Sequence, residues 1–484
     1  MDTQTLLSRR EVLKGLGAMG ALSFVGLMGG CEELIEIIEN RPVRRDISKL
    51  SPTDPIIQTY QAAVNAMKAL PSTDQRNWSR QAQIHYDHCP HGNWYFLPWH
   101  RAYLLAFEQI CRKLTGNSDF ALPYWNWTAN PSVPSVFWGD GNPLYDQNRW
   151  VTPTSVADPS FVGPTVVDSI LNESNFFLFA SAKVTGQRDF GNYGRLEDTP
   201  HNYIHSWIGG FDMGSYWSPR DPVFWAHHNM IECCWIEWNI ERHHANTNDP
   251  QWMDFQFNGD FCDPNGSPID VSVVETLLYP LLSYRFEPCK PNVGAGPMSK
   301  HLSHKEAKAL VKFVKHGAKV RLDFVKRYVL QASLEVTPGR PASGTIKLDP
   351  KHFHDALISE SNRRLLLTLG GVELPDKADY FIRVFVDKAD ASAETPLDDP
   401  HYAGSFAFFF DESAHHHGSE PATSKPGYIV DVGEALRRLN RAGSLPATDQ
   451  VSVQLIPVPF PNREAKPNRF SVQSLELGIV KVTK

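Results

Sequence analysis

Residues 221–238 read DPVFWAHHNMIECCWIEW and join a helix start to a stripe of large apolar side chains. Asp221 and Pro222 are typical of the first positions of a helix. One face of this helix is expected to carry side chains at steps of three and four residues: Phe224, His228, Ile231, Trp235 and Trp238. His228 therefore lies in the buried stripe, whereas His227 points about 100° away from it. One histidine in an aromatic stripe is usually a packed core residue, so this segment alone does not indicate a metal site.

A shorter segment upstream, HNYIH at residues 201–205, also has both ends of a helix marked. It follows Asp198-Thr199-Pro200 and precedes Gly209. His201 and His205 are four residues apart, so they share one helix face, which is the spacing of a two-ligand clamp for one metal. A surface pair of histidines is about as common, and the clamp interpretation gains weight because His228 offers a third ligand.

A second group of histidines lies in QAQIHYDHCPHGNWYFLPWHR, residues 81–101. Another apolar stripe starts here and runs to Gly116, with members His100, Tyr103, Leu104, Phe107, Cys111 and Leu114. Two sets of three histidines, each delivered by helices, are difficult to explain by packing alone, because buried imidazoles need partners. A metal satisfies six converging imidazoles most economically, so the sequence predicts a metal centre.

The ligand types narrow the choice of metal. No carboxylate accompanies these histidines at ligand spacing, which disfavours magnesium, calcium, manganese and the iron site built from two histidines and one carboxylate. Imidazole ligation suits copper or zinc. Two adjacent sites of three histidines favour two copper ions that bind O₂ between them, and a structural or hydrolytic zinc site is the alternative.

Three stretches resemble the tyrosinase, catechol oxidase and hemocyanin family: HGNWYFLPWHR at 91–101, HNYIH at 201–205 and DPVFWAHH at 221–228. The segment LPYWNW at 122–127 is also similar, and the resemblance covers about residues 45–300. It implies a mainly α catalytic domain in which a four-helix bundle holds two copper ions. By motif position, the first copper is expected on His85, His91 and His100, and the second on His201, His205 and His228.

Two positions depart from the family pattern. The gap from His85 to His91 is short, which makes His88 an alternative first ligand, although the surrounding residues match plant-type members with His85 in the ligand place. Glu232 and Cys233 stand where the family has Asp and Arg. The acid is kept, and the cation that would pair with it is expected to be missing.

The resemblance also implies roles for four other residues. Cys89 lies two residues before His91, a spacing similar to that of family members with a thioether bond between these side chains; a buried free thiol is the alternative. Phe224 resembles an aromatic gate over the second copper. Glu197 and Asn202 resemble a pair that holds a water for deprotonating monophenols, and the alternative is a helix-start acid beside a local amide cap.

The length of 484 residues predicts two or three domains. Residues 1–31 resemble a twin-arginine export signal, which predicts a periplasmic or exported protein, and Cys31 is a candidate for a lipid anchor. We place the catalytic domain at 45–300, a helical linker at 301–332 and an all-β sandwich domain at 333–484. This β-rich tail resembles the C-terminal domain of plant-type polyphenol oxidases, which implies that it covers the site and restrains activity.

Two further expectations rest on local patterns. The linker is predicted to be helical because apolar residues recur at steps of three and four from Val311 to Val329. In an exported protein, Cys262 and Cys289 could form a disulfide, whereas the adjacent Cys233 and Cys234 are interpreted as core residues.

The sequence thus predicts an oxidoreductase that uses two copper ions and O₂ to convert o-diphenols to o-quinones. Monophenol ortho-hydroxylation is expected as a second activity. An oxygen-binding protein of hemocyanin type, without turnover, is the alternative. The formal net charge of −7 gives no reason to expect nucleic acid as a partner, so small phenols and O₂ are the expected ligands.

Overall fold

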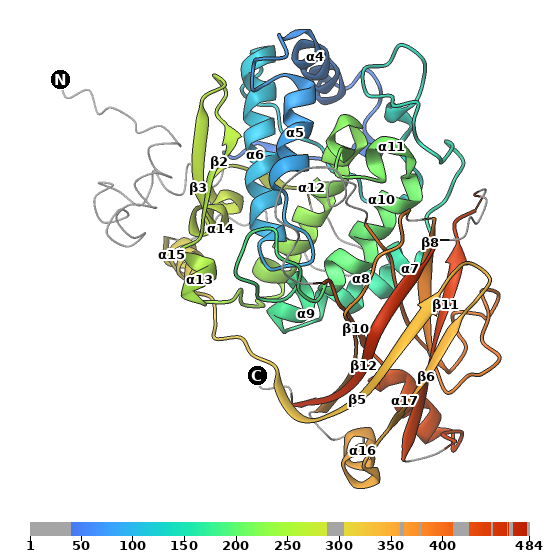
Figure 1. Cartoon of the computed structure of the whole chain (residues 1–484). Helices are drawn as coiled ribbons and strands as arrows, with labels where there is room; N and C mark the ends of the chain where they lie inside the picture. Colours follow the sequence, from blue (N-terminus) through green and yellow to red (C-terminus); the bar gives the residue numbers. More distant parts are fainter. Residues whose placement is uncertain are drawn as a thin grey trace.

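The computed structural model describes residues 40–287, 304–358, 363–377, 379–409, 425–446, 449–461, 463 and 468–481. Figure 1 shows a helical part in blue and green beside a β-rich part in orange and red. Each part has a large hydrophobic core of its own. The predicted fold class, a mainly α domain followed by an all-β domain, is confirmed. The predicted export signal and Cys31 lie outside the described residues.

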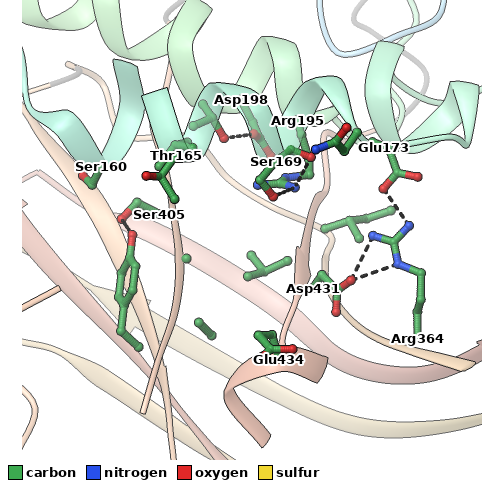
Figure 2. A pocket seen from close by; sticks show the side chains of 18 of the residues that line it. Ser160, Thr165, Ser169, Glu173, Arg195, Asp198, Arg364, Ser405, Asp431 and Glu434 are labelled. Carbon is green, nitrogen blue, oxygen red and sulfur yellow. Dashed lines mark hydrogen bonds and ion pairs between the residues drawn. The ribbon is translucent and has the colours of Figure 1, made fainter. Parts of the chain in front are cut away.

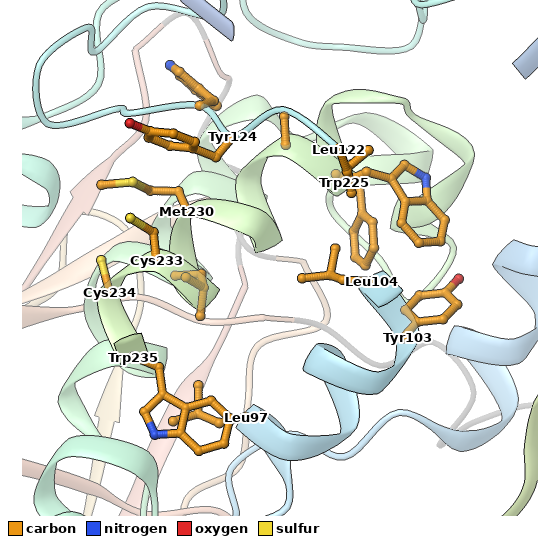
Figure 3. Packing of buried hydrophobic residues seen from close by; sticks show 14 of the residues in the cluster. Leu97, Tyr103, Leu104, Leu122, Tyr124, Trp225, Met230, Cys233, Cys234 and Trp235 are labelled. Carbon is orange, nitrogen blue, oxygen red and sulfur yellow. The ribbon is translucent and has the colours of Figure 1, made fainter. Parts of the chain in front are cut away.

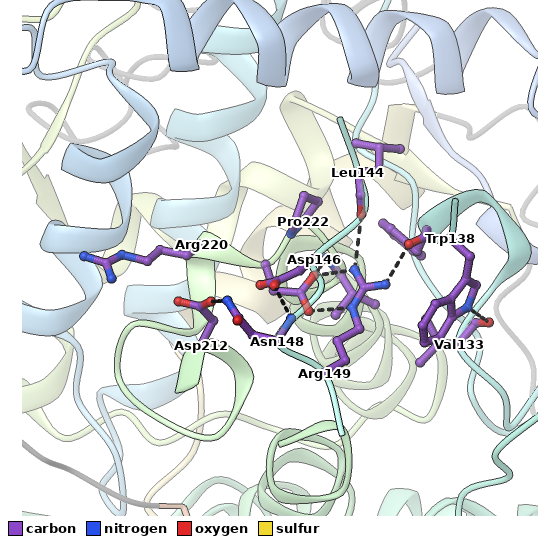
Figure 4. Close-up of polar contacts among 12 residues, drawn as sticks. Val133, Trp138, Leu144, Asp146, Asn148, Arg149, Asp212, Arg220 and Pro222 are labelled. Carbon is purple, nitrogen blue, oxygen red and sulfur yellow. Dashed lines mark hydrogen bonds and ion pairs between the residues drawn. The ribbon is translucent and has the colours of Figure 1, made fainter. Parts of the chain in front are cut away.

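The helical part is built mainly from α4 (Pro55–Ala69), α5 (Trp78–His88), α6 (Phe96–Thr115), α10 (Asn202–Ile208), α12 (Val223–Ile236) and α14 (Val273–Leu282). The start of α12 follows the sequence signal, because the Asp221 side chain accepts a hydrogen bond from the Val223 N–H at 2.9 Å. Arg149 in turn forms a buried ion pair with Asp221 at 2.6 Å. Figure 4 shows the polar contacts around Arg149. The helix that carries two of the histidines therefore begins at a fixed, buried point.

Helices α6 and α12 pack through aromatic rings (Figure 3). Phe107 of α6 stacks on Trp225 of α12 with ring centroids 3.5 Å apart, and Tyr103 lies 4.7 Å from the same ring. Beside them, fully buried Arg44 contacts Glu108 of α6 at 2.9 Å and Asn229 of α12 at 2.7 Å. Removing either partner of a buried pair costs several kcal/mol, about 3–5, so this contact fixes the two helices against each other.

The β-rich part contains two four-stranded antiparallel sheets that share one core. The first has the order β10 (Tyr428–Asp431), β7 (Arg363–Gly370), β12 (Phe470–Lys481) and β5 (Asp323–Val336). The second has the order β6 (Ala342–Lys347), β11 (Gln450–Pro459), β8 (Tyr380–Val386) and β9 (Tyr402–Phe406). Two short helices, α16 (Pro350–Leu357) and α17 (Gly433–Arg441), contact each other and the sheets.

The prediction of a helix over 301–332 is correct only for its first half. Helix α15 spans His304–His316 and ends at Gly317, which adopts a left-handed φ of 54°. The chain then enters β5, which pairs with β12 along its whole length from Asp323 to Val336. The apolar residues near Val325 and Val329 fit helical spacing by chance, and strand pairing overrides that local pattern.

Of the cysteine predictions, the disulfide was wrong, and the placement of Cys233 and Cys234 in the core is confirmed. Cys262 is a free, buried thiol, so it is not bonded to Cys289. Cys233 is disulfide-bonded, which the sequence did not indicate, whereas Cys234 is a free buried thiol. Within the described ranges, every helix is too short or too polar to cross a bilayer.

Candidate metal centre

Seven histidines converge at the core of the helical part. They come from the end of α5, from the loop before α6, from the start of α6, from one π-helical turn at Glu197–His201 that leads into α10, from α10 itself and from α12. All are almost completely buried: His85, His91, His100, His201, His205, His227 and His228. The six predicted ligands are therefore brought together, and His227 joins them.

Backbone carbonyls fix the orientation of three rings. The Nδ1 atoms of His85, His100 and His205 lie 2.7, 2.8 and 2.9 Å from the carbonyl oxygens of Tyr216, Phe96 and Met213. Because a carbonyl can only accept, each Nδ1 carries the proton and donates it. The lone pair of each Nε2 is then directed away from these carbonyls and into the cluster, which is the usual arrangement of a metal-binding histidine.

Several of the nitrogens that face inward lack partners among the described residues. The Nε2 atoms of His85, His91, His100 and His201 are buried and make no hydrogen bond with the described residues. An unpaired buried polar atom costs about 1–3 kcal/mol. Four such atoms in one place are best explained by a metal that accepts their lone pairs, so these residues fit the group that the sequence predicted.

Possible ligand atoms form overlapping groups in which all atoms lie within 4.8 Å of one another. One group joins His85, His100 and His228, and another joins His85, Cys89 and His91. The third contains His201, His205, His227 and His228. His228 thus links the two halves, and its Nε2 lies 3.0 Å from that of His205.

Two alternatives from the sequence can be compared with this arrangement. The side chain of His88 is 45% exposed and lies 3.6 Å from Asp260, outside the cluster, so its position favours His85 as the ligand. His227 was expected to point away, yet its ring stacks on His201 with centroids 5.5 Å apart. Helix geometry alone could not show this, because it depends on where the π-helical turn places His201.

Burial keeps the histidines neutral. Desolvation lowers the pKa of each of the seven, and for His100 and His205 it lowers the pKa to about 3. For all of them except His205, charge repulsion from neighbouring histidines adds to the lowering of the pKa. A neutral imidazole is the form that binds a metal, so no proton has to be displaced from the inward nitrogens.

Cys89 lies beside the first group. Its buried sulfur is 3.4 Å from Nδ1 of His91. This separation is a contact and not a covalent bond, and it places the two side chains where a thioether could form between them.

Three phenylalanines among the described residues contact the cluster, and only Phe224 was expected. The ring of Phe96, at the start of α6, lies 4.7 Å from those of His100 and His201. Phe224 is fully buried, with its ring centroid 4.2 Å from that of His228 and 5.1 Å from that of His85. Phe409 comes from the β-rich part, and its ring lies 4.4 Å from His205 and 4.8 Å from His91. Sequence reasoning missed Phe409, whose only signal was the apolar run at residues 406–410.

Three hydrogen bonds hold the segment that carries Phe409. The Ala407 N–H donates to the Asp198 carbonyl at 2.8 Å, and the Asn202 amide donates to the Ala407 carbonyl at 3.1 Å. The Ser206 hydroxyl donates to the Phe408 carbonyl. Residues 407–409 are therefore fixed to the same helix that presents His201 and His205.

Glu197 and Asn202 both lie next to the cluster. The Glu197 carboxylate accepts hydrogen bonds from the Gly92 N–H and the Ser181 hydroxyl, each at 2.7 Å. Burial raises its pKa to about 8. The Asn202 side-chain oxygen lies 2.9 Å from Nδ1 of His201, so it orients that ring.

The cation expected to be missing near Glu232 is supplied from another helix. Arg101 of α6 donates from Nε to both carboxylate oxygens of Glu232, at 2.8 and 2.9 Å, and the Tyr284 hydroxyl donates to the same group at 2.7 Å. Arg101 directly follows His100, so this buried pair also ties the start of α6 to α12. The loss of Arg at position 233 is thereby compensated.

The comparisons with known proteins agree with this geometry. The family described as the common central domain of tyrosinase matches residues 60–175 and 145–241. A latent polyphenol oxidase of Prunus armeniaca is 28% identical over 412 residues, which cover 75% of this chain and 66% of that protein. A tyrosinase of Hahella sp., strain CCB-MM4, is 26% identical over 459 residues, covering 84% of this chain and 93% of its own length.

The helical part of the chain is similar to the central domain of the tyrosinase family. The fold of the chain agrees with this similarity: the structure of latent apple tyrosinase superposes with a TM-score of 0.65 at 21% identity, covering 91% of this chain and 97% of that one. The chain spans about two thirds of the length of the Prunus armeniaca polyphenol oxidase.

The raised pKa of Glu197 predicts how stability depends on pH. Between its ordinary value of 4.5 and about 8, the folded protein keeps a proton that the unfolded chain has lost. The buried histidines, whose pKa values are lowered, contribute stability that rises with pH up to ~6.5. Glu197 contributes a slope of the opposite sign, because its share of the free energy of unfolding falls as pH rises through this window. We expect Glu197→Gln to remove a large part of the falling contribution in chemical denaturation of copper-free protein.

A residual slope is expected in that variant, because burial also raises the pKa of Asp198 to about 7. The double variant Glu197→Gln with Asp198→Asn should lose the falling contributions of both carboxyls and keep the rising contribution of the buried histidines below pH ~6.5. A Glu197→Gln protein with the full wild-type slope would show that this carboxyl is ionised when folded.

Proposed function

We propose that this protein oxidises phenols with O₂, converting o-diphenols to o-quinones and hydroxylating monophenols at the ortho position. The observation that carries the proposal is the set of buried histidines whose inward Nε2 atoms lack protein partners among the described residues. His85, His91 and His100 would hold one copper, and His201, His205 and His228 the other. When bound, the two copper ions bind O₂ and accept electrons from the phenol.

The protein residues supply rigidity and a dry environment. Carbonyl groups hold three of the rings, and Asn202 holds His201, so the ligands are pre-oriented before metal binding. Aromatic side chains such as Phe224 and Tyr216 pack against the rings and exclude water. We expect these contacts to favour binding of an aromatic substrate once the site is open.

Monophenol hydroxylation needs a base, because a phenol has a pKa near ~10. Glu197 is a candidate with a raised pKa, but both of its oxygens are engaged by Gly92 and Ser181. The amide of Asn202 is engaged by Ala407. We propose that Asn202 becomes able to hold a water near Glu197 only after residues 407–409 leave the site.

The β-rich domain is proposed to keep the enzyme inactive. Residues 45–300 would form the catalytic domain, and residues 333–484 the domain that covers it. Phe409 occupies the space beside His91 and His205, where a phenol ring would have to lie. The Prunus armeniaca polyphenol oxidase and the apple tyrosinase are both described as latent forms, which supports this proposal.

Oxygen consumption tests the proposed activity. Copper-loaded protein should consume O₂ with catechol and, more slowly, with a monophenol such as tyramine. Glu197→Gln should lower the monophenol rate by about a hundredfold, as expected for loss of a general base, and the catechol rate much less. Protein that binds O₂ but never consumes it with catechol would support the hemocyanin-like alternative, and two bound zinc ions would support the zinc alternative.

The role of Phe409 predicts a gain of activity. If the open state is populated at about 1–10%, Phe409→Gly should raise kcat/KM for catechol by about ten- to a hundredfold. Phe409→Leu keeps an apolar side chain in the site and should change the rate little. A Phe409→Gly enzyme no faster than wild type would contradict the covering role.

Covalent processing of the chain is also proposed. A twin-arginine signal within residues 1–31 would direct export to the periplasm, Cys31 would be a lipid anchor, and a thioether would join Cys89 to His91. The 3.4 Å contact between the latter two supports the last proposal. Mass spectrometry of protein purified from copper-grown cells should show the shortened chain, a lipid on Cys31, and a Cys89–His91 peptide lighter by two hydrogen atoms.

A further inference from the structure

A cavity of about 560 Å³ lies between the two domains, away from the histidines. One wall comes from helix α8 (Pro164–Leu171) and the segment 195–199 of the helical part. The other comes from β9, β10 and α17 of the β-rich part. Figure 2 shows side chains from both parts pointing into the space between them. Its size lies in the range of small-molecule sites, about 300–1,000 Å³.

Three arginines line this cavity, and one of them is already neutralised. Arg364 forms ion pairs with Glu173 of the helical part at 2.6 Å and with Asp431 of the β-rich part at 2.9 Å (Figure 2). Its charge is balanced by two carboxylates, so it serves to join the domains. The Arg364 guanidinium therefore offers no net positive charge to a ligand.

Arg195 and Arg438 differ from Arg364. Arg195 donates only to the hydroxyl and carbonyl of Ser169, at 3.1 and 3.5 Å. Arg438 donates only to the carbonyls of Pro400 and Tyr402, the shortest of these contacts being 2.8 Å. Across the described ranges neither forms an ion pair, and each keeps N–H groups for a further acceptor.

Arg195 and Arg438 both line the cavity near Tyr402. Arg438 binds the Tyr402 carbonyl, and Arg195 lies in the same cavity lining. An anion beside Tyr402 would therefore be attracted by both guanidinium groups, which bind carboxylate and phosphate in a planar, two-pronged manner.

The rest of the lining is mostly hydroxylated, with a few apolar side chains and two further carboxyl groups. Glu434 pairs with Arg441 outside the lining at 3.1 Å, and buried Asp198 accepts a hydrogen bond from the Thr199 hydroxyl at 2.6 Å. Hydroxyl groups come from Ser160, Thr165, Ser169, Thr199, Tyr402 and Ser405. We infer that this cavity binds a small, hydroxylated organic anion whose carboxylate or phosphate group lies on Arg195 and Arg438. The hydroxyls supply the donors and acceptors that such a ligand needs.

This site is coupled to the segment that covers the metal centre. The stretch Tyr402–Ser405 lines the cavity and lies just before Ala407 in the chain. The Ala407 N–H donates a hydrogen bond to the carbonyl of Asp198, which also lines the cavity. The site exists only while the two domains are together, so its ligand stabilises the closed arrangement. This step rests on the proposed function: the ligand strengthens the inhibition exerted by Phe409.

Calorimetry on the copper-loaded full chain tests the site without any substrate. The probes are glucuronate, which offers a carboxylate, and glucose 6-phosphate, which offers a phosphate, with uncharged glucose and sodium chloride at equal ionic strength as controls. At least one charged sugar should bind at one site about tenfold more tightly than glucose, and it should raise the thermal unfolding midpoint. Which sugar binds identifies the anionic group; equal binding of all three sugars overturns the proposal.

Three arginine-to-glutamine variants test whether the charged sugar binds in this cavity. Arg195→Gln and Arg438→Gln should each weaken binding of the charged sugar about tenfold, because each removes a charge-assisted contact. Arg340→Gln removes one exposed positive charge from the same domain outside the cavity and should bind like wild type. Variants must first show a wild-type unfolding midpoint without ligand; correctly folded Arg195→Gln and Arg438→Gln proteins that bind as wild type overturn the assignment.

Catechol-dependent O₂ consumption tests whether occupation of the cavity affects the metal site. The charged sugar should slow catechol-dependent O₂ consumption by wild type and Arg340→Gln, but not by Arg195→Gln. Faster or unchanged consumption, at a sugar concentration that saturates the calorimetric site, would overturn the inhibitory role. If the protein oxidises no phenol at all, the proposed function fails, while calorimetry and the unfolding midpoint still decide whether the anion site exists.

Discussion

The structure of the helical part depends on one constraint, the burial of seven imidazole rings, most of whose inward nitrogens have no partner among the described residues. Carbonyl acceptors at Tyr216, Phe96 and Met213 fix the proton on Nδ1 of three rings and so determine which nitrogen faces inward. Desolvation and mutual repulsion keep the rings neutral. This arrangement is unfavourable without a metal, so the rest of the fold must hold it in place.

Buried ion pairs and stacked aromatic rings provide that support. Arg101 and Glu232 join the two helices beside His100 and His228, and Arg149 with Asp221 fixes the start of α12. Such pairs are costly to break once buried, which makes them effective in keeping helices in register. The cost of a partly unsatisfied metal site is thereby offset by contacts outside it.

The β-rich domain connects this site to the rest of the chain. Its segment 407–409 is hydrogen-bonded to the helix that presents His201 and His205, and Phe409 packs against the rings. The same domain contact encloses the cavity with Arg195 and Arg438. Access to the histidines and occupation of that cavity therefore depend on the same interface between the two domains.

The sequence by itself determined the histidines, the capped helices that carry them and the change from helical to β patterning, because these follow from local spacing. It did not determine features that depend on residues distant in the chain. Arg101 as the partner of Glu232, the disulfide at Cys233 and the pairing of β5 with β12 all belong to this class. Only the tertiary structure placed Phe409 beside His205, more than 200 residues earlier, because no periodicity within a segment encodes which surface it will meet.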